Sequence, residues 1–459
     1  MKTAESDLSV SEEELSYKKI AVFFLPLLLS GLMMSAGQPI VQAGLARLKD
    51  PDITLAAYGM AFYTAVLLES PIIMLLPAAN ALVTDQKAYR LTRNCMLAIS
   101  AALTVITAVI TFVTPLYQYL FEQVLGYPEL VASEARPGLA VLLLWPALIG
   151  IRRYYQGILV KFGWTAVVGW GTGARLVSMI LVVMVGNQRF PGYGVVIGSA
   201  ALVIGVLVDA VIAVIASRVL LTHESLPPVS EETPEGARSV AGFVKFFAPL
   251  ALTSVLRTAA RPLMLSGIAR AYRPVLSLAA FPVAMGTASI LANHLRMLRE
   301  VFLTLVEDEE SLDKLKSFSA AVAVGFTIFM SAVAFTPLAN LYHGSIIGLT
   351  GGTLIAANIS LQFLALMPLI RAFQAYYQGL LIKTEKTWPV NGASFANLII
   401  LVGAMNLAAS VTDISGYLIA GVVLPAALAG ESFALWYWSR PCRKIIADTG
   451  TSKTTAACR

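Results

Sequence analysis

Long apolar stretches separated by short polar loops run through almost the whole chain. Twelve of them reach the length of about 20 residues that an α-helix needs to cross the hydrocarbon core of a bilayer. The predicted spans are residues 20–46, 53–83, 92–118, 131–160, 164–186, 193–221, 243–270, 274–303, 315–341, 350–381, 387–409 and 415–439. The pattern predicts an all-α integral membrane protein with twelve transmembrane helices.

A polar segment, HESLPPVSEETPEGAR at residues 223–238, divides the twelve spans into two sets of six. Its prolines and glutamates cannot be buried in a bilayer, so it marks a boundary between two halves. We predict five parts, which are an N-terminal tail over 1–19, a six-helix lobe over 20–222, a linker over 223–238, a second six-helix lobe over 239–440 and a C-terminal tail over 441–459.

The two halves repeat each other at an offset of 222 to 223 residues. PALIGIRRYYQGILVK at 146–161 returns as PLIRAFQAYYQGLLIK at 368–383, so the repeat motif Tyr155-Gln156-Gly157 matches Tyr377-Gln378-Gly379. Further landmarks recur in the same register, namely Pro39 and Pro262, Gly44 and Gly267, Arg47 and Arg270, and Asp209 and Glu431. A tandem duplication explains this shared register. Each half has an even number of spans, so the halves form parallel repeats around a central cavity, and rocking of the two lobes gives alternating access.

Composition supports the membrane interpretation and excludes several other classes. The chain is 57% hydrophobic and 13% charged, with a mean hydropathy of +0.75, whereas soluble domains carry about 25% charged residues. The formal charge of +6 comes from basic residues at helix ends and does not indicate a nucleic-acid partner. Three cysteines without metal-ligand spacing indicate no cofactor or metal. No nucleophile triad or nucleotide-binding fold is recognisable, so we expect a transporter and not an enzyme.

Lysine and arginine in the loops predict the orientation in the membrane. One side collects most of them: Lys18, Lys19, Lys87, Arg90, Arg93, Lys161, Arg218, Arg238, Lys245, Lys314, Lys316, Lys383, Lys386, Arg440, Arg443 and Lys444. The other side has only Arg47, Lys49, Arg136, Arg189, Arg270 and Arg273. We therefore expect both termini in the cytoplasm of a multi-pass plasma or inner membrane protein.

Arginines within the spans distinguish the two halves. Arg257 and Arg261 are spaced i,i+4 and share one helix face, and their counterparts in the first half are Met34 and Gln38. An arginine at a helix centre costs about 2.5–3.5 kcal/mol on insertion scales, so several together must face protein, water or an anion. The residues expected to contact an anionic substrate are Arg257, Arg261, Arg296, Arg299, Arg152, Arg153 and Arg371. Internal ion pairs, packing hydrogen bonds and snorkelling are the alternatives, and Arg175 is expected to be structural.

Acidic residues and one histidine within the spans are candidates for coupling or gating, namely Glu69, Asp209, Glu431, His294 and Glu300. A carboxylate inside the membrane can accept a proton or bind Na⁺. Because Asp209 and Glu431 are equivalent in the duplication, a shared structural task, such as pairing with the Tyr-Tyr-Gln-Gly segments, is the alternative for them. His294 is the only histidine in a predicted span, since His223 and His343 fall in predicted loops; packing or pH sensing would explain it. The Tyr-Tyr-Gln-Gly segments are expected to serve lobe folding or a cytoplasmic gate.

Two parallel six-helix lobes resemble the superfamily that contains the MATE drug exporters, polysaccharide flippases and lipid II flippases. More narrowly, the chain resembles the progressive ankylosis protein family. The residues that carry this resemblance are FLPL at 24–27 with LAAYGMA at 55–61, PLAL at 249–252 followed by Arg257-x-x-x-Arg261-Pro262, Phe281-Pro282-Val283 with Leu295-Arg296, and Gly430-Glu431-Ser432. The resemblance implies a MATE-like two-lobe fold and export of small polyanions such as pyrophosphate, nucleotide triphosphate or citrate. Arg257, Arg261 and Arg296 belong both to these motifs and to the arginines selected above.

We therefore expect a secondary active exporter of a small organic or phosphate-containing anion that works by rocking residues 1–222 against 239–459. One alternative is a flippase for a diphosphate-linked lipid or oligosaccharide. A second is a MATE-type cation or drug antiporter, which predicts a cavity of carboxylates and aromatic residues, and a third is a non-transporting scaffold or channel. The expected partners are membrane lipids, the anion, and H⁺ or Na⁺ as coupling ion, with the protein acting as a monomer.

Overall fold

The computed structural model describes residues 15–221, 236, 239–306, 308–384 and 388–442. Most of the two predicted tails and of the predicted linker lies outside the described residues. The first half forms the helices α1 (Tyr17–Ser35), α2 (Gly37–Leu45), α3 (Pro51–Ile73), α4 (Leu75–Leu82), α5 (Gln86–Phe112), α6 (Thr114–Gln118), η1 (Tyr119–Val124), α7 (Glu129–Val141), η2 (Leu142–Leu144), α8 (Trp145–Lys161), α9 (Thr165–Arg189) and α10 (Gly194–Leu220).

The second half forms an equivalent series, which is α12 (Val240–Ala269), α13 (Pro274–Ala292), η3 (Asn293–Arg296), α14 (Met297–Leu305), α15 (Glu309–Phe335), α16 (Leu338–Asn340), η4 (Leu341–Ile347), α17 (Gly351–Phe363), α18 (Met367–Lys383), α19 (Trp388–Val411) and α20 (Gly416–Ser439). Within the described residues the only β contact is an isolated bridge between Tyr272 and Ser415. The prediction of an all-α fold is confirmed.

In the described part of the chain, eleven helices or runs of consecutive helices are long and apolar enough to span a bilayer, and the bent pair α17–α18, taken as one span, makes a twelfth. The predicted spans agree with these helices within three residues except for spans 3 and 9. Span 3 runs from Gln86 to Phe112 and span 9 from Glu309 to Phe335, so each begins and ends about six residues earlier than predicted. Thr114-Pro115 and Thr336-Pro337 follow, and proline cannot continue the hydrogen-bond ladder of the preceding helix. The residues beyond them form the separate π-helices η1 and η4.

Several spans are broken near their middle. The first span breaks at Ala36 between α1 and α2, and the second at Met74, three residues after Pro71. Short 3₁₀ turns, η2 and η3, interrupt the fourth and eighth spans, and α17 and α18 meet at a bend of 40° just before Pro368. Broken backbone at membrane depth is tolerated only where it is covered by protein or lines a cavity. The breaks therefore indicate where a cavity lies.

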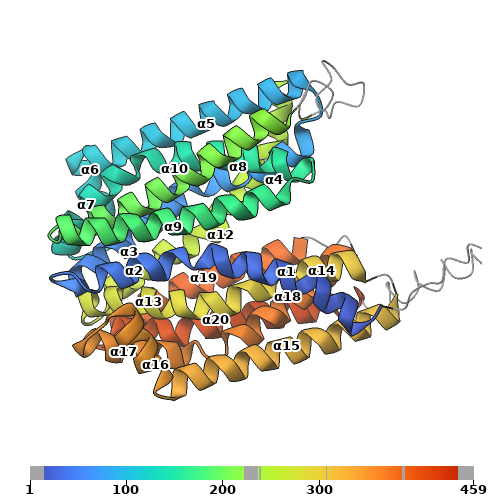
Figure 1. Cartoon of the computed structure of the whole chain (residues 1–459). Coiled ribbons are helices and arrows are strands. Elements are labelled where there is room, and N and C mark those ends of the chain that lie inside the picture. Colours follow the sequence, from blue (N-terminus) through green and yellow to red (C-terminus); the bar gives the residue numbers. More distant parts are fainter. Residues whose placement is uncertain (1–14, 222–235, 237–238, 307, 385–387, 443–459) are drawn as a thin grey trace, which may run out of the picture.

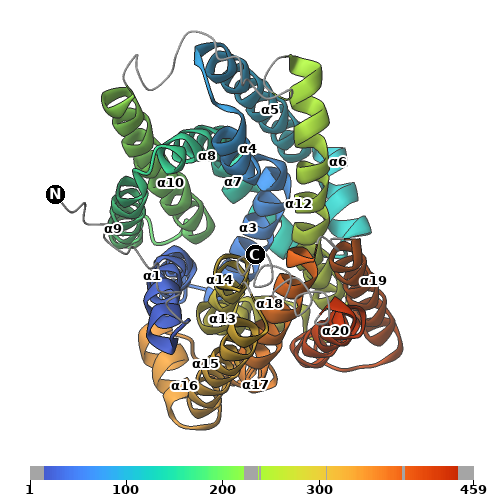
Figure 2. The same cartoon turned by 90° about the vertical axis from the view of Figure 1, so that its right-hand side faces the viewer.

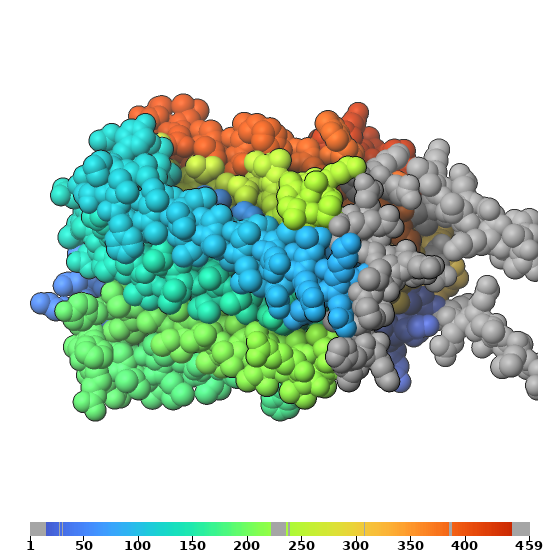
Figure 3. Space-filling model, turned by 90° about the horizontal axis from the view of Figure 1, so that it is seen from above, coloured from blue at the N-terminus to red at the C-terminus, as the bar shows by residue number. Residues whose placement is uncertain are grey.

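The helices form two bundles, seen above and below each other in Figure 1, and the first long helix of each half packs against the opposite bundle. In α1, Phe24 packs edge-on against Phe318 of α15, with ring centroids 5.9 Å apart. In α12, Ser254 Oγ donates a hydrogen bond of 2.6 Å to the Ser70 carbonyl of α3. Figure 2 shows α1 beside α14 and α12 beside α5, and in Figure 3 α12 fills the seam between the two halves.

The two ends of the bundles differ in charge. We call the face where α1 begins and α20 ends the terminal face, and the opposite one, on the left of Figure 1, the far face. Helix ends at the terminal face carry Lys18, Lys19, Lys87, Lys161, Lys383 and Arg440, whereas those at the far face carry Arg47, Arg189 and Arg270. Between the faces the outer surface exposes large apolar side chains, as a lipid-facing surface requires.

Candidate functional site

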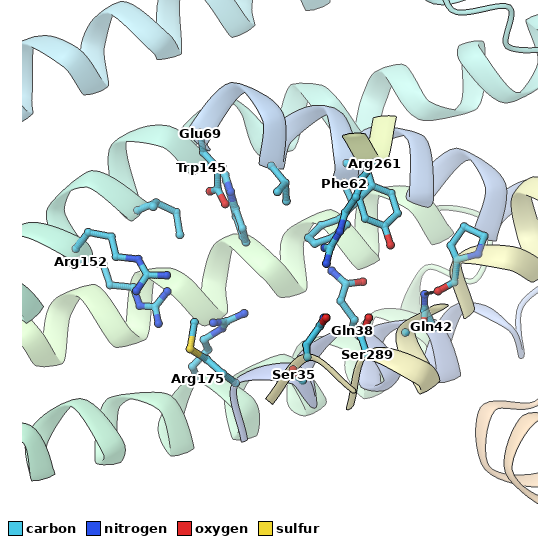
Figure 4. A pocket seen from close by; sticks show the side chains of 18 residues that line it. Ser35, Gln38, Gln42, Phe62, Glu69, Trp145, Arg152, Arg175, Arg261 and Ser289 are labelled. Carbon is cyan, nitrogen blue, oxygen red and sulfur yellow. Dashed lines mark hydrogen bonds between the residues drawn. The ribbon is translucent and has the colours of Figure 1, made fainter. Parts of the chain in front are cut away.

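A cavity of ≈ 260 Å³ lies between the two bundles, at the level of the helix breaks. Side chains of α1, α2, α3, α8 and α9 line it from the first half, and those of α12, α13 and η3 from the second (Figure 4). The lining residues are Met34, Ser35, Gln38, Gln42, Phe62, Tyr63, Val66, Glu69, Trp145, Ile149, Arg152, Arg153, Arg175, Arg261, Pro282, Gly286, Ser289 and Asn293. Four arginines and a single carboxylate give the lining a net positive charge.

Three of these arginines have no carboxylate partner. Within the described residues, neither an ion pair nor a side-chain hydrogen bond joins Arg153, Arg175 or Arg261 to an acid, and the Nε atoms of Arg153 and Arg175 are buried without a hydrogen bond. Arg261 stands over the ring of Tyr63, 5.8 Å from its centroid. Figure 4 shows Arg175 on one side of the cavity and Arg261 on the other. An anion between them would meet guanidinium groups from both halves of the chain.

The fourth arginine, Arg152, is neutralised inside the first bundle. Its Nε lies 2.5 Å from Asp209 Oδ2, and the two side chains are only 3% and 1% exposed. Gln156 Nε2 donates to the other carboxylate oxygen, Oδ1, at 3.2 Å. A Cβ atom on Gly171 would lie 2.4 Å from Asp209 Oδ1, so only glycine leaves room for the carboxylate there. Arg152 therefore borders the cavity without adding a free charge to it.

Glu69 is the one carboxylate among the lining residues. It is 6% exposed, and its Oε2 has no hydrogen-bond partner. It lies beside Trp145 (Figure 4), and the positive charges of Arg152, Arg153 and Arg175 act on it. Glu69 thus partly balances the arginines of the first half without a direct ion pair to any of them.

The second half holds its own cluster around Glu431, outside the cavity lining. Ser394 Oγ and Asn397 Nδ2 each donate to Glu431 at 2.8 Å, and Gln374 Nε2 donates at 3.2 Å. Arg371 Nη1 donates to Gln374 Oε1 at 2.9 Å and so approaches the carboxylate indirectly. Neutral donors hold this acid in place.

Cations surround the Glu431 cluster at longer range. Arg296 is exposed to the positive charges of Arg371, Arg257 and Arg261 as well as to the negative charge of Glu431. Arg257 interacts electrostatically with Arg299 and Glu431. The second half therefore concentrates positive charge next to the cavity, with Arg261 as its member in the lining.

The predicted site residues divide into two groups. Those that line the cavity are Arg152, Arg153, Arg261 and Glu69; those that the structure places elsewhere are Arg257, Arg296, Arg299, Arg371, Asp209, Glu431, His294 and Glu300. Arg299 pairs with its neighbour Glu300 at 2.8 Å. Arg175, which was expected to be structural, lines the cavity. The signal that could have found it is the cost of a lone arginine inside an apolar span.

Two histidines hold helices together. His294 Nε2 lies 2.8 Å from Ser35 Oγ next to the break of the first span, and its ring lies where a Cβ on Gly31 would be. The assignment of His343 to a loop is wrong, because it lies in η4, 0% exposed. Its Nδ1 is 2.7 Å from Asn358 Oδ1 and its Nε2 is 3.0 Å from Thr287 Oγ1. η4 lies outside the membrane-spanning helices, and burial there lowers the pKa of His343.

The Tyr-Tyr-Gln-Gly segments pack inside the bundles. Tyr154 is 0% exposed and donates to the Tyr89 carbonyl at 2.7 Å. Gln156 binds Asp209, whereas its equivalent Gln378 is half-buried and Gln374, one turn earlier, binds Glu431 instead. Tyr155 is buried, and Tyr377 packs against Phe373 with ring centroids 4.5 Å apart. Gly157 and Gly379 each allow a close helix contact.

The described residues contain no group of three or more His, Cys, Asp or Glu side chains arranged to hold a metal ion. The lining residues of the cavity offer ionic recognition by guanidinium groups, together with hydrogen bonds from Gln38, Gln42 and Ser289.

A family model described as progressive ankylosis protein (ANKH) matches residues 9–298. The chain belongs to the progressive ankylosis protein family. The match covers the whole first half, α12 and most of the eighth span, so it includes all four arginines of the cavity lining. The narrower of the two resemblances seen in the sequence is confirmed.

Solved structures with the same fold come from the MOP superfamily. An inward-facing multidrug resistance MATE family transporter is 13% identical, with a TM-score of 0.69, and the match covers 94% of this chain and 99% of that one. The lipid II flippase MurJ in an inward closed conformation is 12% identical, with a TM-score of 0.63 and coverage of 94% and 90%. A MOP superfamily transporter from Pyrococcus furiosus is 16% identical, with a TM-score of 0.54 and coverage of 94% and 96%.

These likenesses show that the chain has the MATE-like two-lobe fold.

Proposed function

We propose that this protein is a secondary active exporter of a small multivalent anion, of the organic acid, pyrophosphate or nucleotide class, that binds between the two lobes. The observation that carries the proposal is the arrangement of Arg153, Arg175 and Arg261 in the cavity. Two come from the first half and one from the second, so the anion would link the lobes. An anion bound in this way can couple its occupancy to rocking, because its contacts change when the lobes move.

The charge of the lining favours a multivalent substrate. Arg152 is paired with Asp209, which leaves three arginines against the single carboxylate of Glu69, and hence two net positive charges. Charge-assisted hydrogen bonds from guanidinium groups are stronger than neutral ones, and carboxylate or phosphate oxygens match their geometry. A dianion would balance the lining with Glu69 ionised, and a monoanion would leave it positive.

The same lining disfavours a cationic drug. A cation in this cavity would face three unpaired guanidinium groups at low dielectric, where like charges repel strongly. The related transporter from Pyrococcus furiosus is described as having a binding pocket of reversed polarity that suggests a different function. The arginine lining of the cavity in this chain would likewise differ in polarity from the pocket of a drug exporter.

Glu69 is our candidate for coupling to H⁺. When it is ionised it balances part of the arginine charge, and when it is protonated one more positive charge becomes available to the substrate. Protonation of Glu69 would therefore strengthen anion binding. We further propose that the terminal face, with its lysines, is cytoplasmic, in accordance with the positive-inside rule, and that the protein acts as a monomer in a plasma or inner membrane.

The first test is thermal stabilisation of the purified protein by citrate, pyrophosphate, ATP and a cationic dye, with a diphosphate lipid in the detergent micelle as a separate sample. We expect a shift with at least one multivalent anion, and its loss in Arg261→Ala and in Arg153→Ala. Removing one charged contact of about 1.5–3 kcal/mol should raise the Kd roughly tenfold to hundredfold.

Arg189→Ala is the matched control, because Arg189 is exposed at the far face and is absent from the lining. It should keep the full shift. Stabilisation by the dye alone would support a cation antiporter in place of the proposal, and stabilisation by the diphosphate lipid alone would support a flippase.

A further inference from the structure

Each half of the chain ends its third span with the same backbone device. The π-helices η1 (Tyr119–Val124) and η4 (Leu341–Ile347) are equivalent in the duplication, and each is followed by a glycine with positive φ. These glycines, Gly126 at +73° and Gly348 at +95°, are 222 residues apart. Both devices lie at the far face. We call the carbonyl groups at the end of each π-helix, with the following glycine, a socket.

The socket of the second half receives Arg47 from the first half. Arg47 Nη2 donates to the carbonyls of Ser345 at 3.0 Å and Ile346 at 2.8 Å, and Nη1 donates to that of Ile347 at 2.8 Å. All three bonds join residues of opposite halves. The guanidinium thus covers the carboxyl end of η4, where unpaired carbonyls carry partial negative charge.

The socket of the first half receives Arg270 from the second half. Arg270 is the duplication equivalent of Arg47, and its Nη2 donates to the carbonyl of Val124 at the end of η1. Its Nη1 donates to Asn406 Oδ1 of α19 at 2.6 Å, which holds the guanidinium in its direction. Next to it, Ser266 Oγ donates to the Leu125 carbonyl at 2.7 Å. The two halves therefore exchange arginines.

Glycine is needed in both sockets for two reasons. A positive φ is strained for residues with a side chain. In addition, a Cβ on Gly126 would lie 2.7 Å from Arg270 Cγ, and one on Gly348 would lie 3.1 Å from Arg47 Cγ. The glycines thus let each arginine lie directly against the backbone of the opposite half.

We propose that Arg47 and Arg270, each seated in the socket of the opposite half, form the gate that closes the cavity toward the far face, and that both must leave their sockets before the cavity opens there. The lobes cannot separate at this face while guanidinium groups bridge them. Backbone carbonyls accept from both arginines, and the Asn406 side chain also accepts from Arg270, so no carboxylate takes part in either socket. This inference uses the two-lobe transporter fold and does not depend on which substrate is carried.

Two further hydrogen bonds between described residues of the two halves must also break at this face. Thr353 Oγ1 of α17 donates to Asp52 Oδ1 of α3 at 2.6 Å, and Ser266 binds Leu125 as described. Each is a single hydrogen bond donated by a hydroxyl group, whereas each arginine guanidinium offers several charged N–H donors. We therefore expect the arginines to dominate the equilibrium between closed and open far faces. Loss of one should shift it roughly tenfold, and loss of both roughly a hundredfold.

Accessibility of the cavity tests the gate. In a variant whose native cysteines are replaced by serine, Ser289→Cys places a thiol in the lining, and a membrane-impermeant maleimide is added from the far side without substrate. We expect slow labelling in this background, about tenfold faster labelling in Arg47→Ala or Arg270→Ala, and about a hundredfold faster labelling in the double variant. Spin labels at Gln188 and Asp413, exposed at the far ends of α9 and α19, should separate in the double variant.

Arg136→Ala is the matched control. Arg136 also binds helix-end carbonyls near the far face, those of Thr111 at 2.9 Å and Phe112 at 3.2 Å, but entirely within the first half. Its loss should leave far-side labelling unchanged. If the double variant labels no faster than the background, or if Arg136→Ala labels equally fast, the gate is disproved.

The double variant Arg47→Lys/Arg270→Lys keeps the positive charges but loses the planar set of guanidinium donors. It replaces the alanine double variant in the labelling assay if that variant does not fold. It should label at an intermediate rate, and a rate equal to the background would overturn the proposal. Failure of every anion in the stabilisation assay would disprove the proposed substrate class and leave this labelling result unaffected.

Discussion

The two buried acids that the duplication makes equivalent, Asp209 and Glu431, have different neighbours. Positions equivalent in the two halves are Arg152 and Gln374, and Arg175 and Asn397. Asp209 therefore has a direct ion pair and a second cation nearby. Glu431 has amide and hydroxyl donors instead. One half stabilises its acid with charge and the other with neutral hydrogen bonds.

This difference shows how one scaffold provides two kinds of surface. In the first half, the cations beside the acid also border the cavity. In the second half, the cations sit on positions where the first half is uncharged, since Arg257, Arg261 and Arg296 correspond to Met34, Gln38 and Ile73. The buried acid is present in both halves, whereas the charged residues around the cavity stand at different positions in each half.

The largest expected effect comes from removing the charge of Asp209. Asp209→Asn leaves Arg152 buried without its counter-charge, which costs about 3–5 kcal/mol when one partner of a buried pair is lost. Glu431→Gln should cost only about 1–2 kcal/mol, because its hydrogen bonds come from neutral donors. The free energy of unfolding, measured by denaturing-detergent titration, tests this order.

Arg152→Gln/Asp209→Asn is the control, since it gives the first half the amide found at Gln374. The double variant should be more stable than Asp209→Asn alone. Equal losses of unfolding free energy for Asp209→Asn and Glu431→Gln would show that the two acids contribute equally to stability despite their different neighbours.

The repeated glycines should differ by a smaller amount. A Cβ on Gly157 would lie 2.5 Å from the Leu76 carbonyl oxygen and 2.8 Å from Ala79 Cβ, whereas one on Gly379 would lie 2.8 Å from the side chain of Phe302. Backbone cannot move aside, but a ring can shift. We expect Gly157→Ala to cost about 3 kcal/mol and Gly379→Ala about 1 kcal/mol.

The same unfolding titration measures both glycine variants. Gly169→Ala, where a Cβ would meet nothing within 4 Å, is the control and should be neutral or slightly stabilising. A larger loss for Gly379→Ala than for Gly157→Ala would contradict the packing argument.

The smallest expected effect concerns the two π-helices. His343 in η4 corresponds to the buried Phe121 in η1. Because burial lowers the pKa of His343, the unfolded chain, with a histidine pKa near 6.5, binds a proton before the folded protein does. Its contribution is therefore complete above pH 6.5 and declines as the pH falls below that value. We expect the free energy of unfolding to fall between pH 7.5 and 5.5, by no more than about 1.4 kcal/mol, which is the limit for one group with an unfolded pKa near 6.5.

His343→Phe gives η4 the residue of η1 and should remove this pH dependence, although the loss of the hydrogen bond to Asn358 Oδ1 lowers stability at every pH. Parallel stability curves for the variant and the wild type between pH 7.5 and 5.5 would rule out His343 as the titrating group.

Much of the fold could be predicted from the sequence because the bilayer demands long apolar helices and the duplication repeats them. The twelve spans followed from hydropathy, and the shared register of Asp209 with Glu431 revealed the two halves. The C-terminal ends of spans 3 and 9 were misplaced for one reason. Hydropathy stays high past Pro115 and Pro337, whereas the helical hydrogen bonds are interrupted there. His343 was taken for a loop residue because η4 is a short segment that contains Gly344 and is followed by Gly348.

The candidate site was less predictable, since it depends on contacts between helices. Spacing placed Arg257 and Arg261 on one helix face, but their height along α12 decides which of them reaches the cavity, and only Arg261 lines it. The pairing of Arg152 with Asp209 joins α8 to α10, and hydropathy within single spans carries no information about it. Arg175 was predicted to be structural for the same reason, because its place in the cavity lining depends on how α9 packs against other helices.

The exchange of first helices and of arginines between the halves follows the rule of a two-fold symmetric dimer, in which a contact made by one subunit is returned by the other. Arg47 and Arg270 still make such symmetric contacts at the far face, since each binds the socket of the opposite half. In a fused chain the two halves need not carry the same residues at other positions, because a substitution in one half leaves the other half unchanged. A symmetric homodimer would present the same charges twice, and a ligand could bind it in two equivalent orientations. The first half contributes Arg175 and Glu69 to the cavity, and the second half contributes Arg261. This fused chain can therefore hold an asymmetric ligand in a single orientation.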